Sequence, residues 1–279
     1  MTKKAAPVSG PLLINESNLS LAWAKAVMHV MDHAGSEITP LILSTTGFDE
    51  SGDPIEDMEI RRLLDAILEA QGLKSIEDIA FTIFPQRLWR VAQGSRNKLF
   101  EYYRAAFPRY QAMNRRDNSR GLYFERLMMY PGAPCEGNQL EWLISQFNGR
   151  DGVRRSMFQA SVFDPARDHV STAQLQFPCL QHVTFEPTSE GLVVNAFYAT
   201  QQLFVKAYGN YLGIAQLVSF MAHEMSMRPA RMNVIVGVEK LEGISKNNPA
   251  LVELINVARR RICNAGQAVE QERSEGVEA

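Results

Sequence analysis

The sequence predicts an α+β fold arranged as a single domain. Of its 279 residues, 46% are hydrophobic, which is enough for one large core or two smaller ones. Segments with the apolar spacing of helices occur together with shorter segments typical of strands. We find no internal repeat and no convincing linker, which favours one domain. We expect residues 15–264 to form it, between a flexible lead at residues 1–14 and a polar, acidic tail at residues 265–279.

Charge and cysteine content limit the possible functions. Lysine and arginine number 29 against 31 aspartates and glutamates, and the formal charge of -2 gives no sign of a nucleic-acid or anionic membrane partner. The first residues lack the apolar region of a signal peptide, and no run approaches the roughly 18 apolar residues of a spanning helix. We therefore expect a cytoplasmic protein. Its three cysteines, Cys135, Cys179 and Cys263, are too widely spaced for a disulfide framework or a zinc site, so we expect reduced thiols and no metal.

The N-terminal half is predicted to be mainly helical. Ser17 or Asn18 can cap a first helix, which stops at Gly35. Further helices are expected at residues 53–72 and 88–107.

The rest of this half is predicted to contain a strand and loops. The apolar run at residues 39–45 suits a strand, and Pro40 limits it to a strand start or an edge. Residues 46–54 are polar and form a loop, and residues 79–84 are a short apolar segment. The basic residues 110–120 are expected to be an exposed loop with a solvated surface, in preference to a binding role.

The C-terminal half mixes strands and helices. Helices are expected at residues 138–148 and 249–263, and strands at residues 156–163 and 233–238. Between them, a strand that starts near Cys179 turns through residues 188–191 into a second strand. A long apolar helix follows.

Cys179 is the candidate nucleophile. Free cysteines are usually inert core residues, so the residue type alone is weak evidence. Pro178 precedes it, however, and places it at the head of a strand, where a side chain can face a cleft.

The region 120–245 resembles the thymidylate synthase superfamily, folate-dependent enzymes that methylate or hydroxymethylate a pyrimidine nucleotide at C5. Pro178 and Cys179 match the start of the family's Pro-Cys-His motif, and Asn210 lies at the family's spacing from the cysteine. Gly237 falls on the glycine of the GDxHxY motif. Upstream, NQLEWLISQFNGRDGVRR is similar to DQLxxxxxxLxxDPxSRR, and Tyr123 to Arg126 in GLYFERL is similar to a shortened YGxQWR.

The resemblance implies a fold, a chemistry and a partner. The fold would be a large twisted mixed sheet flanked by helices, in a homodimer packed sheet to sheet. Arg154 and Arg155 would reach into the neighbouring subunit to hold the phosphate of a pyrimidine nucleotide, and Arg126 would also contact substrate. The Cys179 thiolate would add to C6, with a reduced folate, 5,10-methylenetetrahydrofolate, as the one-carbon donor. Asn210 would read the edge of the base.

Several positions depart from the family pattern. Ala199 occupies the position of the family arginine that holds phosphate beside the nucleophile. Leu180 occupies the position of the family histidine that follows the cysteine. The other departures are Thr200 for serine, Gln202 for the folate-linked aspartate, Lys206 for glycine, and Lys240 and Glu242 for the histidine and tyrosine that hold the sugar hydroxyl. Ordinary thymidylate synthesis is therefore not expected, because a charged hydrogen-bond partner worth about 1.5 to 3 kcal/mol is lost.

Three hypotheses follow. The first is a diverged transferase that keeps covalent attack by Cys179, with Lys206, Lys240 and Glu242 remaking the polar contacts. Tyr198 and Thr200, on one strand face, are then candidates to line the cleft. The second is a non-catalytic nucleotide-binding or scaffold protein of the same fold.

The third hypothesis is an unrelated α+β binding module, in which Cys179 and Asn210 lie far apart or face a packed core. Asn210 also has a simpler alternative role, as the cap of the helix that follows it.

Overall fold

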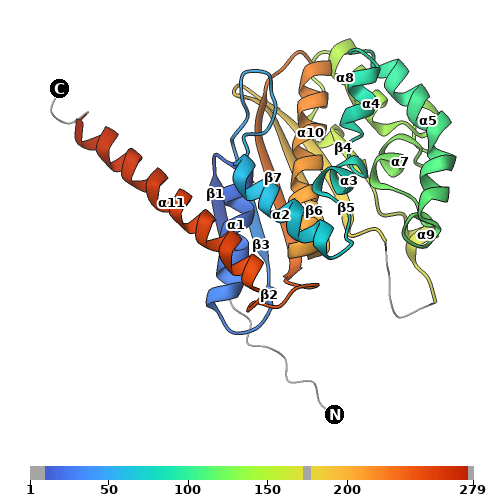
Figure 1. Ribbon diagram of the computed structural model, residues 1–279. Helices are drawn as coiled ribbons and strands as arrows, with labels where there is room; N and C mark the ends of the chain where they lie inside the picture. Colours follow the sequence, from blue (N-terminus) through green and yellow to red (C-terminus); the bar gives the residue numbers. More distant parts are fainter. Residues whose placement is uncertain (1–9, 172–176, 276–279) are drawn as a thin grey trace.

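A mixed β-sheet forms the centre of the protein. The computed structural model describes residues 10–171 and 177–275, and within these residues seven strands form one sheet in the order β1-β3-β7-β6-β5-β4, with β2 beside β7 (Figure 1). The strands are β1 (Leu12–Glu16), β2 (Glu37–Ile38), β3 (Leu41–Thr45), β4 (Gln159–Ser161), β5 (Leu180–Thr188), β6 (Gly191–Gln202) and β7 (Pro229–Lys240). β1 pairs with β3, and β6 with β7, in parallel, whereas the other neighbours are antiparallel.

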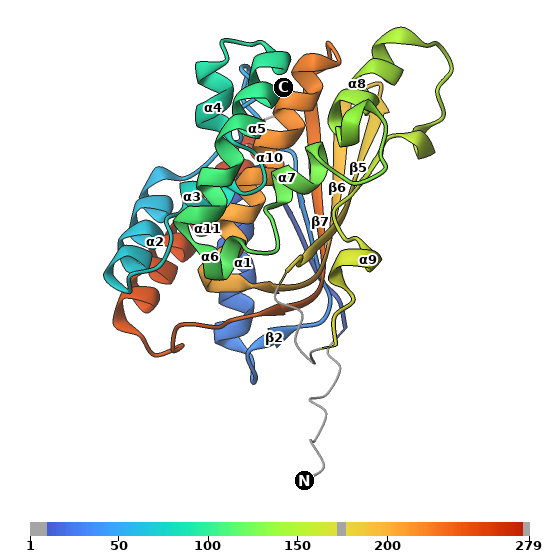
Figure 2. The same cartoon turned by 90° about the vertical axis from the view of Figure 1, so that its right-hand side faces the viewer.

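Most of the helices gather on one side of this sheet (Figure 2). The α-helices are α1 (Leu19–Asp32), α2 (Met58–Ala70), α3 (Ile76–Phe81), α4 (Gln86–Val91), α5 (Arg96–Met113), α6 (Arg115–Asn118), α7 (Tyr123–Met128), α8 (Gln139–Gly149), α9 (Pro165–Asp168), α10 (Tyr208–Glu224) and α11 (Pro249–Glu275). Shorter turns are η1 (Cys135–Gly137), η2 (Arg155–Met157) and the π-helical η3 (Leu203–Ala207). None of the described helices is long and apolar enough to cross a membrane. The predicted α+β class with a mixed sheet flanked by helices is confirmed at this level.

The start of the described chain departs from the prediction. Asn18 is the residue that caps α1, accepting a hydrogen bond from the backbone N–H of Leu21 at 3.1 Å. The expected lead at residues 1–14 overlaps β1, because the backbone from Leu12 onward pairs with β3. Pro40 lies directly before β3, as a strand start.

Two later segments are more helical than predicted. The expected loop at residues 110–120 continues α5 and adds α6, whose first turn is capped by Asn114. The expected tail is helical as far as Glu275 in α11. Alanine, glutamine and glutamate have high helix propensity, which can sustain a helix even where the sequence pattern shows no apolar face.

Helix α10 lies at the centre of the core, against the sheet and α3. Nearly every residue from Tyr208 to Ala222 is buried. Close approach to α3 requires glycine at two positions: a Cβ at Gly209 would lie 2.6 Å from Cβ of Ile79, and one at Gly213 would lie 2.8 Å from the backbone oxygen of Ala80. This packing holds the first turn of α10, and with it Asn210, in one place.

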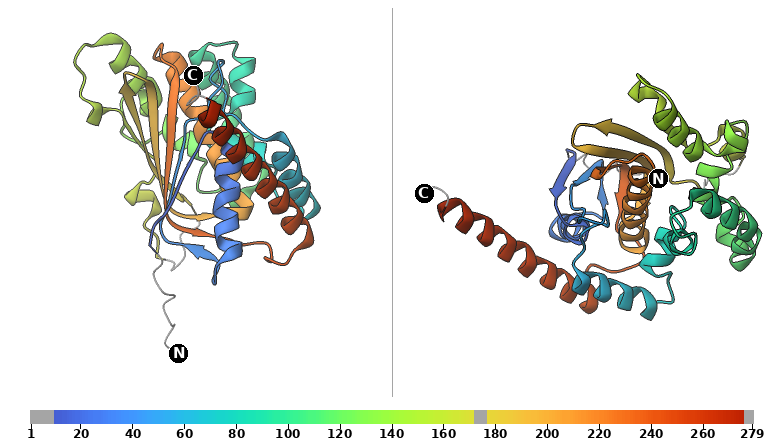
Figure 3. Two further views of the ribbon diagram at one scale, coloured as in Figure 1. Left: turned by 90° about the vertical axis from the view of Figure 1, so that its left-hand side faces the viewer. Right: turned by 90° about the horizontal axis from the view of Figure 1, so that it is seen from above.

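The other face of the sheet is partly exposed. In the left view of Figure 3, α1 and α11 lie to the right of the blue and orange strands. On the opposite side, Leu13, Ile42, Ile235 and Phe197 are neighbours in register across β1, β3, β7 and β6, and Leu13 and Phe197 are 68% and 43% exposed. An apolar row therefore crosses a face that no helix buries fully.

Near their C-terminal ends, β6 and β7 both interrupt the regular alternation of buried and exposed side chains. On β6, Tyr198 and Gln201 are buried while the two residues between them are exposed, and on β7 Val236 and Glu239 are buried around two partly exposed residues. A Cβ at Gly237 would lie 2.7 Å from the backbone oxygen of Ala199, so the strands approach closely here. The shift turns Glu239 toward α10, where it meets Tyr211.

Candidate functional site

A cavity of about 350 Å³ contains the candidate nucleophile. Its walls come from segments that are far apart in sequence: Cys179 just before β5, Tyr123 at the start of α7, Lys206 in η3 and Asn210 in the first turn of α10. Residues of α3 and α6 close the remaining side. The tertiary fold thus brings a thiol, an amine, a phenol and an amide to one cavity.

Cys179 is held by its backbone at the edge of β5. Its carbonyl accepts a hydrogen bond from the backbone N–H of Ala199 at 3.0 Å, and Gln181 Nε2 donates to the carbonyl of Pro178 at 2.7 Å. Burial raises the pKa of the thiol, and the charge of Lys206 and a hydrogen bond with Tyr123 act in the opposite direction. The thiol is therefore favoured until a ligand or a further contact stabilises the thiolate.

Tyr123 lines the cavity together with this thiol. Burial raises its pKa, and the proximity of Cys179 raises it further. At neutral pH the hydroxyl keeps its proton and can donate a hydrogen bond to a thiolate. Phe177 packs against the Tyr123 ring, with 5.0 Å between ring centroids, and gives the cavity an aromatic wall.

Asn210 faces the same cavity although only 3% of it is exposed. It does not cap α10, because the helical backbone already begins in η3 and Ala207 precedes the first residue of α10. Among the described hydrogen bonds its side chain makes none, so its amide is available to a ligand. The binding-module hypothesis expected Cys179 and Asn210 far apart or against a packed core, whereas both line one cavity.

Four other predicted residues lie outside the set that lines this cavity. Thr200 is exposed. Gln202 donates to Glu242 Oε2 at 3.1 Å, and Lys240 pairs with Glu242 Oε1 at 2.9 Å, so these three side chains form a polar cluster where β6 and β7 end. These three side chains were expected to contact substrate, but they contact one another and do not line this cavity.

Tyr198 is fully buried behind the cavity wall and does not line the cavity. The prediction that it faces a cleft fails because Tyr198 belongs to the buried face of β6, before the shift that exposes Ala199 and Thr200.

The predicted arginines have different surroundings. Arg126 is 1% exposed, and its guanidinium donates to the two carboxylate oxygens of Asp168 at 2.8 and 3.1 Å. It therefore forms an internal ion pair that joins α7 to α9. Arg154 and Arg155 are exposed and are not among the residues lining the cavity of their own chain.

Sequence reasoning missed part of this site. The sequence analysis named Tyr123 only as part of a shortened motif. It named Lys206 as a residue that would contact substrate, without placing it beside Cys179. Neither has a spacing signal, because their approach to Cys179 depends on the path of α7 and η3 through the fold. A π-turn such as η3 is often found at functional sites.

A second cavity adjoins the first. It measures about 420 Å³ and shares Lys74, Thr82, Asn114, Asn118 and Leu122 with the cavity of Cys179. Phe81 and Tyr110 line it with their rings 5.1 Å apart, edge to face. Together the two cavities offer a polar end near Cys179 and an aromatic end farther away.

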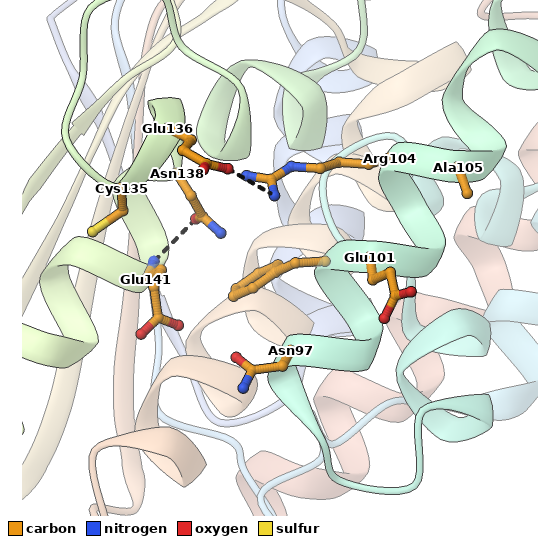
Figure 4. Close-up of a pocket in the computed structure, with 9 residues that line it drawn as sticks. Asn97, Glu101, Arg104, Ala105, Cys135, Glu136, Asn138 and Glu141 are labelled. Atoms are coloured by element: carbon orange, nitrogen blue, oxygen red, sulfur yellow. Dashed lines mark hydrogen bonds and ion pairs between the residues drawn. The ribbon is translucent and has the colours of Figure 1, made fainter.

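A larger cavity, of about 650 Å³, lies between α5 and α8 (Figure 4). Arg104 approaches Glu136 at 3.6 Å across it, and Cys135 lies on the far side of the cavity from Arg104. Cys135 is exposed, and its charged neighbours are solvated. We therefore favour the smaller cavity, where the thiol is enclosed beside an amine and a phenol.

Neither a family model nor a curated protein matches the chain.

Proposed function

We propose that the protein is a diverged one-carbon transferase of the thymidylate synthase type, acting at C5 of a pyrimidine nucleotide. The observation that carries the proposal is the meeting of Cys179, Lys206, Tyr123 and Asn210 in one cavity. The same cavity supplies a nucleophile, a positive charge beside it, and an amide that can both donate to and accept from a base.

Each residue has a role in the proposed chemistry. The Cys179 thiolate forms a bond to C6, which makes C5 nucleophilic toward the one-carbon unit. The one-carbon unit would pass to C5 as its bond to the folate nitrogen breaks, and the C5 proton would pass to water. A hydride from the reduced folate would complete a methyl group, or water a hydroxymethyl group, and cleavage of the bond between sulfur and C6 returns the thiolate. Lys206 and Tyr123 stabilise the sulfur anion before attack and after release, in place of the arginine missing at Ala199.

The one-carbon unit would come from a reduced folate. The adjoining cavity supports this because Phe81 and Tyr110 offer an aromatic surface next to the nucleotide end. Lys74 lies between the two cavities and can attract an anionic group.

The transfer is tested by tritium release from C5-labelled dUMP, dCMP, UMP and CMP with 5,10-methylenetetrahydrofolate. We expect release on one of them by the native protein and by Cys135→Ser, and none by Cys179→Ala. If no substrate releases tritium but a thermal-shift screen shows nucleotide binding, the non-catalytic hypothesis replaces this one. If there is neither release nor binding, both hypotheses fail.

We also propose that the active form is a homodimer joined through the partly exposed face of the sheet. The row of Leu13, Ile42, Ile235 and Phe197 supports this, because a row of apolar side chains on an open sheet favours a partner surface. Exposed Arg154 and Arg155 would then be free to reach the partner's cavity. Light scattering at micromolar concentration should show a dimer, and Phe197→Glu should convert it to a monomer. A stable native monomer would refute this arrangement.

A further inference from the structure

Helix α1 holds the π-turn η3 at both ends. Trp23 of α1 is fully buried, and its indole Nε1 donates a hydrogen bond to the carbonyl of Leu203, the first residue of η3, at 2.9 Å. One turn earlier on α1, the hydroxyl of Ser20 lies 2.6 Å from the hydroxyl of Tyr208, which directly follows η3. Residues three apart share a face of a helix, so one face of α1 contacts both ends of the turn.

Tyr208 has further contacts that fix its side chain. Its hydroxyl donates to Oε2 of Glu56 at 2.8 Å, and Oε1 of Glu56 pairs with the guanidinium of Arg61 on α2 at 2.6 Å. The Tyr208 ring also packs edge to face on the indole of Trp23, with 5.7 Å between ring centroids. Tyr208 is 1% exposed, so solvent hardly competes for these contacts. The contacts at the two ends of η3 therefore support each other.

A π-turn needs such support because its hydrogen-bond spacing is rare and is mostly confined to a single turn within an α-helix. Here η3 lies between the end of β6 and the start of α10. Leu203 and Tyr208 are five residues apart, which is the spacing that a π-turn closes. The contacts from α1 therefore stabilise this turn at the two residues that define its length.

The turn brings Lys206 to the Cys179 cavity. Lys206 of η3 and Asn210 of α10 are four residues apart, so they share a helix face, and both line that cavity. The other titratable side chains that line it are those of Lys74, Asp117 and Tyr123. The charged atoms of Lys74 and Asp117 lie 3.4 Å apart, whereas Lys206 forms no ion pair within the described residues. Lys206 is therefore the unpaired positive charge that this cavity offers to a thiolate.

We propose that Trp23 and Tyr208 are positioning residues that hold Lys206 in the Cys179 cavity. Neither side chain lines the cavity, so both act through η3. Loss of either contact lets the turn relax and increases the average separation between the ammonium group and the sulfur, which weakens their attraction. The inference rests on the proposed function, because the place of this charge matters for transfer only if Cys179 is the nucleophile.

The test measures the alkylation rate of Cys179 by iodoacetamide from pH 6 to pH 10. Cys135 and Cys263 are exposed, so both are first replaced by serine. Trp23→Phe keeps an aromatic ring but loses the N–H donor, and Tyr208→Phe loses only the hydroxyl. Each should raise the apparent pKa of the thiol by about half a unit and slow alkylation at pH 7 about threefold, because one pKa unit changes the thiolate fraction about tenfold.

The same two substitutions are then made in the Lys206→Met variant. Residues that act only by positioning Lys206 have nothing to position once its charge is removed. Trp23→Phe and Tyr208→Phe should therefore leave the alkylation rate of Lys206→Met unchanged, although each slows the protein that retains Lys206. This non-additivity is the signature of coupling, and a general loosening of the fold would not produce it.

Trp89→Phe and Tyr103→Phe are the matched controls. Trp89 packs on Phe220 in the C-terminal part of α10, with 5.0 Å between ring centroids, and its indole N–H has no hydrogen-bond partner within the described residues. Tyr103 is fully buried, and within the same residues its hydroxyl has no partner either. Neither side chain lines the Cys179 cavity, so neither replacement should change the pKa of the thiol.

An unchanged alkylation rate in folded Trp23→Phe overturns the positioning role. Thermal midpoints are recorded for every variant, and Tyr208→Phe decides if Trp23→Phe fails to fold. Equal slowing with and without Lys206, or the same slowing in a control variant, also overturns it. Slowing that depends on Lys206, without tritium release on any substrate, would refute the proposed function and keep the positioning role. Tritium release with slowing that is independent of Lys206 would do the reverse.

Discussion

The buried acid Glu239 should make the protein less stable as pH rises, and Glu239→Gln should remove that dependence. Burial raises the pKa of Glu239 in the folded state, whereas in the unfolded chain it returns to about 4.3. Between these two values the unfolded state binds fewer protons than the folded state. Stability from Glu239 is therefore fully present below the unfolded pKa and is lost as pH rises toward the folded pKa.

The magnitude follows from the linkage relation. One proton difference changes the free energy of unfolding by about 1.4 kcal/mol for every pH unit. Glu239 is fully buried, and Tyr211 is the one hydrogen-bond partner of its carboxyl group among the described residues, so little solvent screening reduces this slope. The free energy of unfolding of Glu239→Gln minus that of the wild-type protein should therefore increase above about pH 4.3, by up to about 1.4 kcal/mol for every pH unit.

Urea unfolding at half-unit pH steps from 5 to 8 measures this difference. Other buried acids, such as Glu56 and Glu125, also have raised pKa values because of burial, but they titrate in both proteins and cancel in the difference. A constant difference across the range would show that Glu239 is ionised in the folded protein throughout. The argument that burial keeps Glu239 protonated in the folded protein would then be refuted.

Three further predictions concern the ion pair, the site and the core. Arg126→Met should destabilise the protein by about 3 to 5 kcal/mol in urea unfolding, because it leaves the buried carboxylate of Asp168 unpaired; adding Asp168→Leu should recover most of this loss. Lys206→Met should slow alkylation of Cys179 at pH 7, whereas Lys206→Arg should not, since the charge is what lowers the thiol pKa. Gly213→Ala should cost about 1 to 3 kcal/mol by overpacking α10 against α3.

Each of these has a clear contrary result. The ion-pair argument fails if Arg126→Met unfolds at the wild-type urea concentration. The role of Lys206 fails if the two Lys206 variants react alike, or if added salt does not reduce the effect of this exposed charge. Gly149→Ala is the control for the core, because nothing lies within 4 Å of a Cβ at that position, and an equal loss from it would refute the packing argument.

Local patterns were sufficient for most elements of the fold. The cap at Asn18, the proline before β3 and the long apolar helix α10 depend on short-range chemistry, and their predictions agree with the structure. Errors occurred where local signals were weak. β1 has no strong pattern of its own and forms through pairing with β3, while α6 carries polar residues typical of a loop.

The candidate site was predicted in part. Cys179 and Asn210 were chosen from their motif spacing, and both line one cavity. Arg126 was chosen from a motif and Tyr198 from the alternation of side chains along a strand, but both are buried and neither lines the cavity. Spacing along a strand does not reveal a change of face such as the one between Tyr198 and Gln201.

The sequence alone determined the fold class, the nucleophile candidate and the absence of an arginine at Ala199, because these depend on residue type and local order. Only the tertiary structure decided what surrounds the thiol. Lys206 of η3 and Tyr123 of α7 line the cavity of Cys179, and Glu239 of β7 is buried against Tyr211 of α10. Burial and proximity shift the pKa of each buried group, and both are properties of the folded chain that no short stretch of sequence contains.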